Sequence, residues 1–286
     1  MPRTSTALLL FLIAAPLAAA DRPMVIAHRG GSASRPENTL PAFQHALRIG
    51  VSMLEFDMNL TSDGRIIIHH DSTVNAKICK APEGSGVTAR PIGLMTLLQL
   101  EQFDCGSFDR PNSPRYKAVP DTKMPTLDEF LATVVDSKIP LLGETKMPPE
   151  GAEYAPDPVS FVDLVIASLK KFGVEDRFIL QSADYRTLDA MRQKNPKVGI
   201  CLLNARRFKP RYLELAKKHH ATHIMLRTDD ATPEQLQALR AAGVKILSST
   251  ANTREDWKAY ADLKMDGILT DDPEGLLEFL GQQPAK

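Results

Sequence analysis

Histidines and carboxylates that follow short apolar runs are the residues of this chain best suited to chemistry. His28 follows the run Met24–Ala27, and His70 closes a predicted hairpin. Cleavage of a phosphodiester takes one proton from the attacking oxygen and gives another to the leaving oxygen, and histidine can do both near neutral pH. We therefore interpret His28 and His70 as an acid/base pair, although a structural role would fit either histidine alone equally well.

Three acidic residues are candidates for holding a divalent metal ion. Glu55 and Asp57 are two positions apart in a predicted strand, so their side chains point to the same face. Two carboxylates this close repel each other in a partly dry site, and a cation removes the repulsion. Glu144, near the end of a later strand, would add a third oxygen ligand. Oxygen-only ligands favour Ca²⁺ or Mg²⁺ over zinc, while salt bridges to lysines are the alternative.

Two basic residues stand beside these candidates. Arg29 follows His28 directly, and its guanidinium has the donor geometry that grips a phosphate. Lys146 lies two positions after Glu144, on the same face. Arg29 and Lys146 are therefore candidate phosphate-binding residues. The plainer alternatives are a solvated loop arginine and a simple bridge between Glu144 and Lys146.

Short apolar runs alternate with amphipathic segments after residue 20. The predicted strands are Met24–Ala27, Met53–Met58, Ile139–Gly143, Arg177–Leu180, Val198–Leu203, Thr222–Leu226, Val244–Leu247 and Gly267–Thr270. The predicted helices are Pro41–Ile49, Pro158–Phe172, Tyr185–Asn195, Arg211–His219, Pro233–Ala242, Arg254–Leu263 and Glu274–Leu280. This alternation favours an α/β fold, a (β/α)8 barrel of the TIM type, whose catalytic groups follow the strands. A doubly wound open sheet is the alternative, but no G-x-G-x-x-G motif follows the first strand.

Two segments interrupt this alternation. Thr61–His70 is predicted to form a hairpin, with Ser62–Gly64 as its turn. Residues 72–123 are rich in glycine, proline and charge and contain one predicted helix, near Thr96–Phe103. We expect this segment to be an insertion over one mouth of the barrel, because a loop that long in a compact domain is usually functional or disordered.

Residues 1–20 have the pattern of a secretory signal peptide. Arg3 precedes the apolar run Ala7–Ile13, and the small residues Ala18–Ala20 precede Asp21. The run is shorter than the roughly 20 residues that cross a bilayer, and a retained anchor is the alternative. We expect an exported protein, periplasmic or secreted, with no stable membrane span, whose mature domain covers residues 21–286.

The cysteines and the charge balance restrict the remaining possibilities. Export permits a disulfide, and Cys79 and Cys105 flank one irregular segment and could pair. Cys201 lies in an apolar run and is expected to be a buried thiol. Lys plus Arg and Asp plus Glu both total 35, so no net field favours nucleic acid or acidic lipid. The sequence leaves the oligomeric state open.

The ordered motifs of the chain resemble those of the glycerophosphodiester phosphodiesterases. They are His28-Arg29-Gly30, Pro36-Glu37-Asn38-Thr39, Glu55-x-Asp57, Asp63-Gly64, His70-Asp71, Met124 to Glu129, Glu144-x-Lys146, Gln181-Ser182 and Asp266 to Pro273. The resemblance covers nearly all of the chain after residue 20. It implies a TIM-type barrel with a small insertion that hydrolyses glycerophosphodiesters to glycerol 3-phosphate and an alcohol.

The resemblance also implies roles for individual residues. Glu55, Asp57 and Glu144 would bind the metal, His28 and His70 would be the acid/base pair, and Arg29 and Lys146 would hold phosphate. A glycerol hydroxyl would attack phosphorus and give a cyclic phosphate, which water then opens. The two histidines would exchange roles between these steps.

Two departures from the family pattern bear on substrate choice. Ser249 stands where the family often has a tryptophan, and Asn75-Ala76-Lys77 replaces a frequent arginine after His70-Asp71. A pocket without that ring would accept a different alcohol or a longer lipid head. The alternative activity is that of a phospholipase C- or D-like relative acting on phospholipids or lysophospholipids. A scaffold that has lost turnover is the non-enzyme alternative.

Overall fold

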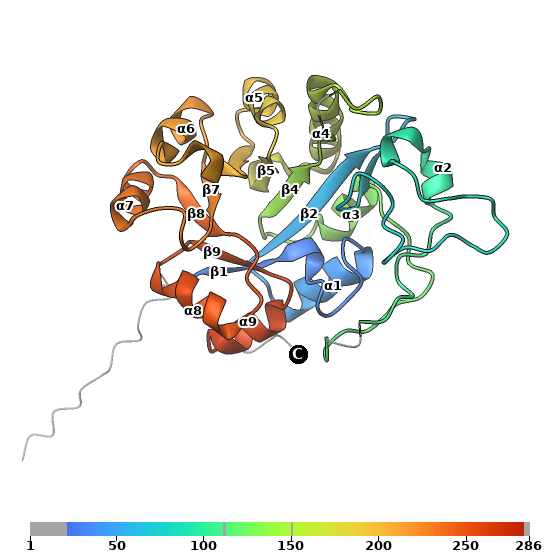
Figure 1. Cartoon of the computed structure of the whole chain (residues 1–286), viewed down its shortest axis with the longest axis horizontal. Coiled ribbons are helices and arrows are strands. Elements are labelled where there is room, and N and C mark those ends of the chain that lie inside the picture. The colour runs from blue at the N-terminus through green and yellow to red at the C-terminus, as the bar shows by residue number, and fades with distance from the viewer. Residues whose placement is uncertain (1–21, 111–112, 150, 283–286) are drawn as a thin grey trace, which may run out of the picture.

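Eight parallel strands close into a barrel, and the helices between them form its outer layer (Figure 1). The computed structural model describes residues 22–110, 113–149 and 151–282, so the predicted signal peptide at residues 1–20 lies outside the described residues. The barrel strands are β1 (Met24–Ala27), β2 (Met53–Leu60), β4 (Leu141–Thr145), β5 (Phe178–Ser182), β6 (Gly199–Leu202), β7 (His223–Leu226), β8 (Lys245–Ser248) and β9 (Gly267–Thr270). Strand β1 pairs with both β9 and β2, which closes the ring. The predicted TIM-type barrel is confirmed, and the open-sheet alternative is wrong.

The outer helices follow the strands in regular order. They are α1 (Leu40–Ile49), α3 (Leu127–Val134), α4 (Pro158–Phe172), α5 (Tyr185–Lys194), α6 (Tyr212–Lys218), α7 (Pro233–Ala241), α8 (Arg254–Asp262) and α9 (Pro273–Phe279). Of these, α3 is the one that the periodicity of the sequence does not predict. Its signal is a capping box, in which Thr126 and Glu129 each accept a hydrogen bond from the other's backbone amide.

The two faces of the strands meet different surroundings. Outward-facing side chains of β2, such as Phe56, pack with Phe43 and Phe130 from the surrounding helices. Inward-facing apolar side chains fill the amino-terminal part of the barrel: Ile26, Met53, Leu142, Ile179, Cys201, Leu247 and Leu269. Cys201 is a buried free thiol, as expected. This apolar filling leaves the carboxyl ends of the strands as the place where polar side chains gather.

A hairpin and an irregular segment separate β2 from α3. Strand β3 (Ile66–Ile68) runs antiparallel to β2, which confirms the predicted hairpin. The segment beyond it contains the short helix α2 (Leu97–Leu100) and lies beside the barrel (Figure 1). Its own apolar cluster consists of Ile67, Val74, Cys79, Ile92, Met95, Leu100, Phe103, Cys105 and Met124. A disulfide joins Cys79 and Cys105, a pairing that the sequence permits but leaves open.

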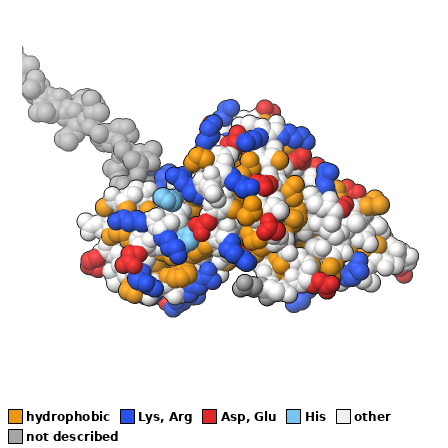
Figure 2. Space-filling model, turned by 90° about the horizontal axis from the view of Figure 1, so that it is seen from above, with side chains coloured by type: hydrophobic (Ala, Val, Ile, Leu, Met, Phe, Trp, Pro, Cys, Tyr) orange, Lys and Arg blue, Asp and Glu red, His pale blue; other side chains and the backbone are white. Residues whose placement is uncertain are grey.

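The outer surface shows no segregation of charge on the face seen in Figure 2, where acidic, basic and apolar side chains are mixed. This agrees with the equal totals of basic and acidic residues. Within the described ranges, no helix combines the length and the apolar character that crossing a membrane would require.

Candidate functional site

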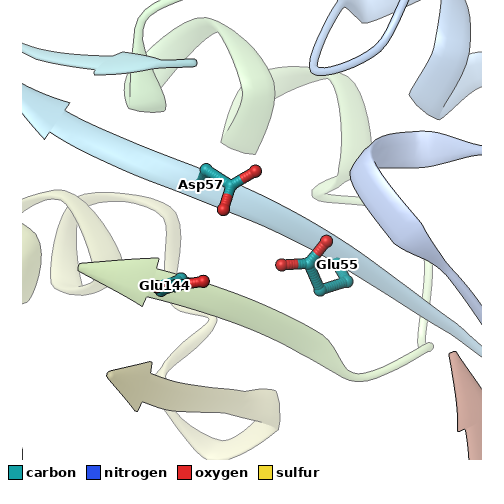
Figure 3. Close-up of side chains that lie close together, drawn as sticks. All are labelled: Glu55, Asp57 and Glu144. Carbon is teal, nitrogen blue, oxygen red and sulfur yellow. The ribbon is translucent and has the colours of Figure 1, made fainter. Parts of the chain in front are cut away.

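Three carboxylates from two neighbouring strands converge on one point (Figure 3). Glu55 and Asp57 project from β2 and Glu144 from β4, and one oxygen of each lies within 4.8 Å of the others. The strand register explains the convergence, because Asp57 and Glu144 are direct partners across β2 and β4. Glu55 and Asp57 are buried, and Glu144 is half-buried. The structure thus brings the three candidate ligands together in one acidic cluster.

The acidic cluster cannot easily hold three negative charges on its own. Burial, and then the charge of Asp57, raise the pKa of Glu55 to about 8. Burial also raises the pKa of Glu144 to about 7, although Lys146 opposes this. The pKa of Asp57 is lowered despite its burial, because Lys146 and other basic side chains surround it. A divalent cation in the cluster would allow all three carboxylates to ionise at neutral pH.

The donor set of the acidic cluster fits a hard cation. Gln181 Nε2 donates to Glu55 Oε1 at 2.7 Å, and Asn38 Nδ2 donates to Asp57 Oδ2 at 2.8 Å, so both carboxylates are held in place. The amide oxygen of Gln181 is buried and has no hydrogen-bond partner within the part of the chain that the structure describes. Carboxylate and amide oxygens are the ligands that Ca²⁺ and Mg²⁺ prefer. The cluster could therefore bind such an ion.

Two basic side chains lie against the acidic cluster. Lys146 Nζ is 3.0 Å from Glu144 Oε1 and 3.5 Å from Asp57 Oδ1. Arg29 Nε is 3.7 Å from Asp57 Oδ2. The bridge between Glu144 and Lys146, the plainer alternative for this pair, is present. The Lys146 side chain is nevertheless 18 % exposed, and that of Arg29 is 20 % exposed. Both ammonium and guanidinium groups can therefore still meet an anion at the mouth of the barrel.

A tight turn at His28–Gly30 directly follows β1 and leads into the cluster. Gly30 has a φ of 80°, and a Cβ there would lie 2.8 Å from the Cβ of Ala42, so the turn needs glycine. The backbone amide of Arg29 donates to Glu55 Oε2 at 2.9 Å. This turn therefore fixes the two residues before Gly30 at the edge of the cluster.

His28 is oriented by a carboxylate from the last barrel strand. Its Nδ1 lies 2.7 Å from Asp271 Oδ1, which also accepts from Ser32 Oγ at 2.7 Å, while Asp271 Oδ2 accepts from Asn252 Nδ2 at 2.7 Å. Burial lowers the pKa of His28, but the hydrogen bond to Asp271 and the nearby carboxylate charges raise it overall. With Nδ1 directed at Asp271, Nε2 is the nitrogen left for chemistry, and it lies 3.3 Å from Arg29 Nε.

His70 is oriented by its own sequence neighbour. Its Nδ1 lies 2.7 Å from Asp71 Oδ1, and Asp71 Oδ2 accepts from Asn75 Nδ2 at 2.7 Å. His70 is 32 % exposed and Asp71 is 42 % exposed. His69 points the other way, as expected from strand alternation, and its buried Nε2 accepts from the backbone amide of Asn75. The second candidate histidine thus also has a carboxylate on Nδ1, and its Nε2 has no hydrogen-bond partner among the described residues.

Several partners of the site residues carry no role in the sequence interpretation. They are Asp271, Asn38 and Gln181, which lie 243, 19 and 126 positions from the residues that they contact. Barrel closure brings Asp271 to His28, because β9 pairs with β1. All three residues stand in motifs that the chain shares with the family it resembles, but a motif does not say which side chain its residues contact.

Three clefts open around the acidic cluster. One of about 640 Å³ is lined by His70 and Lys146, and one of about 550 Å³ by Glu144, Lys146 and Tyr185. A third, of about 620 Å³, is lined by residues near His28 that include Asp271. These clefts leave room for a small ligand beside His70, Lys146 and Asp271.

Comparisons with known proteins agree with this geometry. Residues 28–275 match the model of the glycerophosphoryl diester phosphodiesterase family. A glycerophosphodiester phosphodiesterase of Caldanaerobacter subterraneus subsp. tengcongensis is 28 % identical over 261 residues, which cover 91 % of this chain and 98 % of that protein. A solved Silicibacter pomeroyi protein, provisionally assigned to the same class, has a TM-score of 0.81 at 25 % identity and covers 92 % of this chain and 96 % of its own. An Oleispira antarctica phosphodiesterase, solved with its product sn-glycerol-3-phosphate, shares the fold with a TM-score of 0.75 at 23 % identity, covering 91 % and 97 %.

Proposed function

Because the chain belongs to the glycerophosphoryl diester phosphodiesterase family, we propose that it hydrolyses glycerophosphodiesters to glycerol 3-phosphate and an alcohol. The observation that carries the proposal is the buried acidic cluster with two histidines near it, each oriented by a carboxylate. A protein that only binds its ligand has no need of two such histidines.

The acidic cluster would hold a divalent cation, Ca²⁺ or Mg²⁺, through Glu55, Asp57 and Glu144. When bound, the cation would supply positive charge to the phosphate and lower the pKa of a substrate hydroxyl. The raised pKa values of Glu55 and Glu144 and the unpartnered amide oxygen of Gln181 support this assignment.

Arg29 and Lys146 would bind the phosphate oxygens. Their cationic groups lie on opposite oxygens of Asp57, with Arg29 nearest Oδ2 and Lys146 nearest Oδ1. A phosphate over the acidic cluster would meet one cation on each side. Hydrogen bonds between charged partners are about twice as strong as neutral ones, so both contacts would help to hold the reacting phosphorus in place.

His28 and His70 would move the protons of the reaction. In the first step, one histidine takes the proton of a glycerol hydroxyl as its oxygen bonds to phosphorus, and the other protonates the leaving alcohol oxygen. In the second step, water opens the cyclic phosphate and the two histidines exchange roles. The carboxylate on each Nδ1 leaves Nε2 as the proton-carrying atom in both steps.

The protein would act after export, in the periplasm or outside the cell. The signal-peptide pattern of residues 1–20 motivates this, and the disulfide between Cys79 and Cys105 is compatible with an oxidising compartment. Mass spectrometry of the mature protein should find its amino terminus at or near Asp21. An intact Met1 in the membrane fraction would contradict export by cleavage.

A substrate panel tests the proposed activity. We expect purified protein with Mg²⁺ or Ca²⁺ to release glycerol 3-phosphate from glycerophosphocholine, and EDTA to abolish the release. His28→Ala should be inactive in the same assay. Choline or a cyclic phosphate released from lysophosphatidylcholine, with glycerophosphocholine untouched, would instead identify a lipid phosphodiesterase. Absence of turnover on every substrate would contradict an enzymatic function.

A further inference from the structure

The insertion reaches the loop that carries His28 and Arg29. Arg110 Nη1 donates to the carbonyl of Ser32 at 3.1 Å, and the backbone amide of Lys117 donates to the carbonyl of Ser34 at 3.0 Å. The guanidinium of Arg110 also lies 5.5 Å from the ring centre of Tyr116. A segment outside the barrel thus contacts the first active-site loop directly.

Arg110 and Arg29 share one carboxylate. Glu37 Oε2 accepts from Arg110 Nη2 at 2.5 Å, and Glu37 Oε1 accepts from Arg29 Nη1 at 2.8 Å. Glu37 is only 10 % exposed, whereas the two arginines are half-buried. Its pKa is lowered in spite of that burial, because the two guanidinium groups hold its charge. Glu37 is therefore an ionised carboxylate in which each oxygen accepts a hydrogen bond from a different arginine.

This sharing controls how tightly Arg29 is held. With Oε2 occupied by Arg110, Glu37 can offer Arg29 one oxygen. Arg29 Nε contacts His28 Nε2 at 3.3 Å, and its Nη2 has no hydrogen-bond partner among the described residues. An unshared Glu37 could instead take Arg29 in a two-oxygen pair, which is the geometry that a carboxylate and an arginine favour. Such a pair would compete with phosphate for the same donors.

The disulfide and its neighbours fix the start of the segment that bears Arg110. Lys80 and Asp104 exchange backbone hydrogen bonds at 2.9 Å in both directions, next to the bond between Cys79 and Cys105. The backbone amide of Cys105 also donates to the carbonyl of Thr122 at 2.7 Å. Arg110 follows five residues later, so the insertion presents it from a fixed base.

We infer that Arg110 is a positioning residue for phosphate binding: by occupying one oxygen of Glu37, it keeps Arg29 free to bind the substrate phosphate. The inference rests on the proposed function, in which Arg29 holds phosphate. The insertion would then contribute to phosphate binding through Arg110, a contact that no barrel strand provides among the described residues.

Variants of Arg110 test this inference by binding and by kinetics. The dissociation constant of inorganic phosphate with Mg²⁺ is measured by calorimetry, and KM and kcat are measured with glycerophosphocholine. Arg110→Gln should raise the phosphate dissociation constant and KM about tenfold and leave kcat within about twofold, as expected when a uniform binding contact is lost. Arg110→Lys should recover most of the loss, because its ammonium can still occupy Glu37 Oε2.

Two controls separate positioning from simple docking of the insertion. Arg115→Gln removes contacts of the same insertion with Asp272 and Glu278 and should change phosphate binding less than about twofold. In an Arg29→Gln background, Arg110→Gln should have no further effect. Equal losses in Arg110→Gln and Arg115→Gln, an additive loss in the double variant, or unchanged phosphate binding in Arg110→Gln would each overturn the inference. Phosphate binding does not depend on turnover, so an inactive parent protein would count against the proposed function alone.

Discussion

The half of the barrel mouth around His28 is built very differently from the half around His70. His28 is 14 % exposed, and its partner Asp271 comes from the opposite end of the chain and is itself held by Ser32 and Asn252. His70 is 32 % exposed, and its partner Asp71 is the next residue. The first half depends on barrel closure, whereas the second is assembled within one short segment.

Two histidines with the same local geometry can therefore differ in how much their orientation depends on the residues around them. Each has a carboxylate 2.7 Å from Nδ1. A buried charged pair loses much when one partner is removed, whereas water can replace part of an exposed contact. We therefore expect the two histidines to be equally essential and their supporting residues to be unequally so.

The largest expected effect is loss of either histidine. His28→Ala and His70→Ala should each lower kcat by roughly a thousandfold, within the range expected for a general acid or base. Steady-state release of glycerol 3-phosphate measures this, with circular dichroism as the folding control. A loss of less than about tenfold in one variant would remove that histidine from the acid/base pair.

The second largest effect is loss of the carboxylate that orients each histidine, and it should differ between the two halves. Asp271→Asn should lower kcat/KM by about a hundredfold and Asp71→Asn by about tenfold, because the first carboxylate is more buried and orients a more buried imidazole. Equal losses would show that burial of the supporting carboxylate does not matter here.

The same pair of variants has a pH signature. The pKa of His28 lies above 6.5, and Asp271 helps to raise it, so Asp271→Asn should move the His28 limb of the kcat/KM profile to lower pH. As long as Asp271 is ionised, the pairing stabilises the fold fully below pH 6.5, and this effect is lost as pH rises through the folded-state pKa of His28. Asp271→Asn should therefore destabilise the protein more at pH 6 than at about pH 9, as measured by urea unfolding. A limb shifted to higher pH would contradict the assigned contact.

Removal of the disulfide should destabilise the protein and weaken phosphate binding. Cys79→Ser with Cys105→Ser opens a link of 26 positions, which loop-entropy arguments value at about 3–4 kcal/mol of unfolding free energy. Because Arg110 follows Cys105 by five residues, phosphate binding should weaken several-fold. A lower unfolding free energy with unchanged phosphate binding would show that the disulfide does not influence the active site.

The smallest effect concerns the choice of alcohol. Ser249 is hydrogen-bonded to the Tyr260 hydroxyl at 2.8 Å, at a position where the family often has an aromatic ring. Ser249→Trp should change the ratio of kcat/KM for glycerophosphocholine and glycerophosphoglycerol by about threefold to tenfold, the range of a modest change in a pocket. An unchanged ratio would place this position outside the alcohol pocket.

The sequence was informative wherever strand periodicity decided the outcome. Alternation in Glu55-x-Asp57 placed both carboxylates on one face, and the apolar runs predicted the barrel strands. Helix α3 was not predicted, because its sequence signal is the capping box of Thr126 and Glu129 rather than a long amphipathic pattern. The partners Asp271 and Arg110 could not be predicted, because their contacts follow from barrel closure and from the path of the insertion. Local periodicity carries no information on either.

The most direct test of the account is metal binding to the acidic cluster, measured by calorimetry on metal-stripped protein alongside its activity. We expect one Mg²⁺ or Ca²⁺ to bind per chain and turnover to return in proportion to the metal occupancy of the acidic cluster. Glu55→Gln should abolish both, and the control Asp128→Asn, at a carboxylate paired with Lys171 away from the cluster, should abolish neither. Full activity in metal-stripped protein, or unchanged metal affinity in Glu55→Gln, would contradict the account.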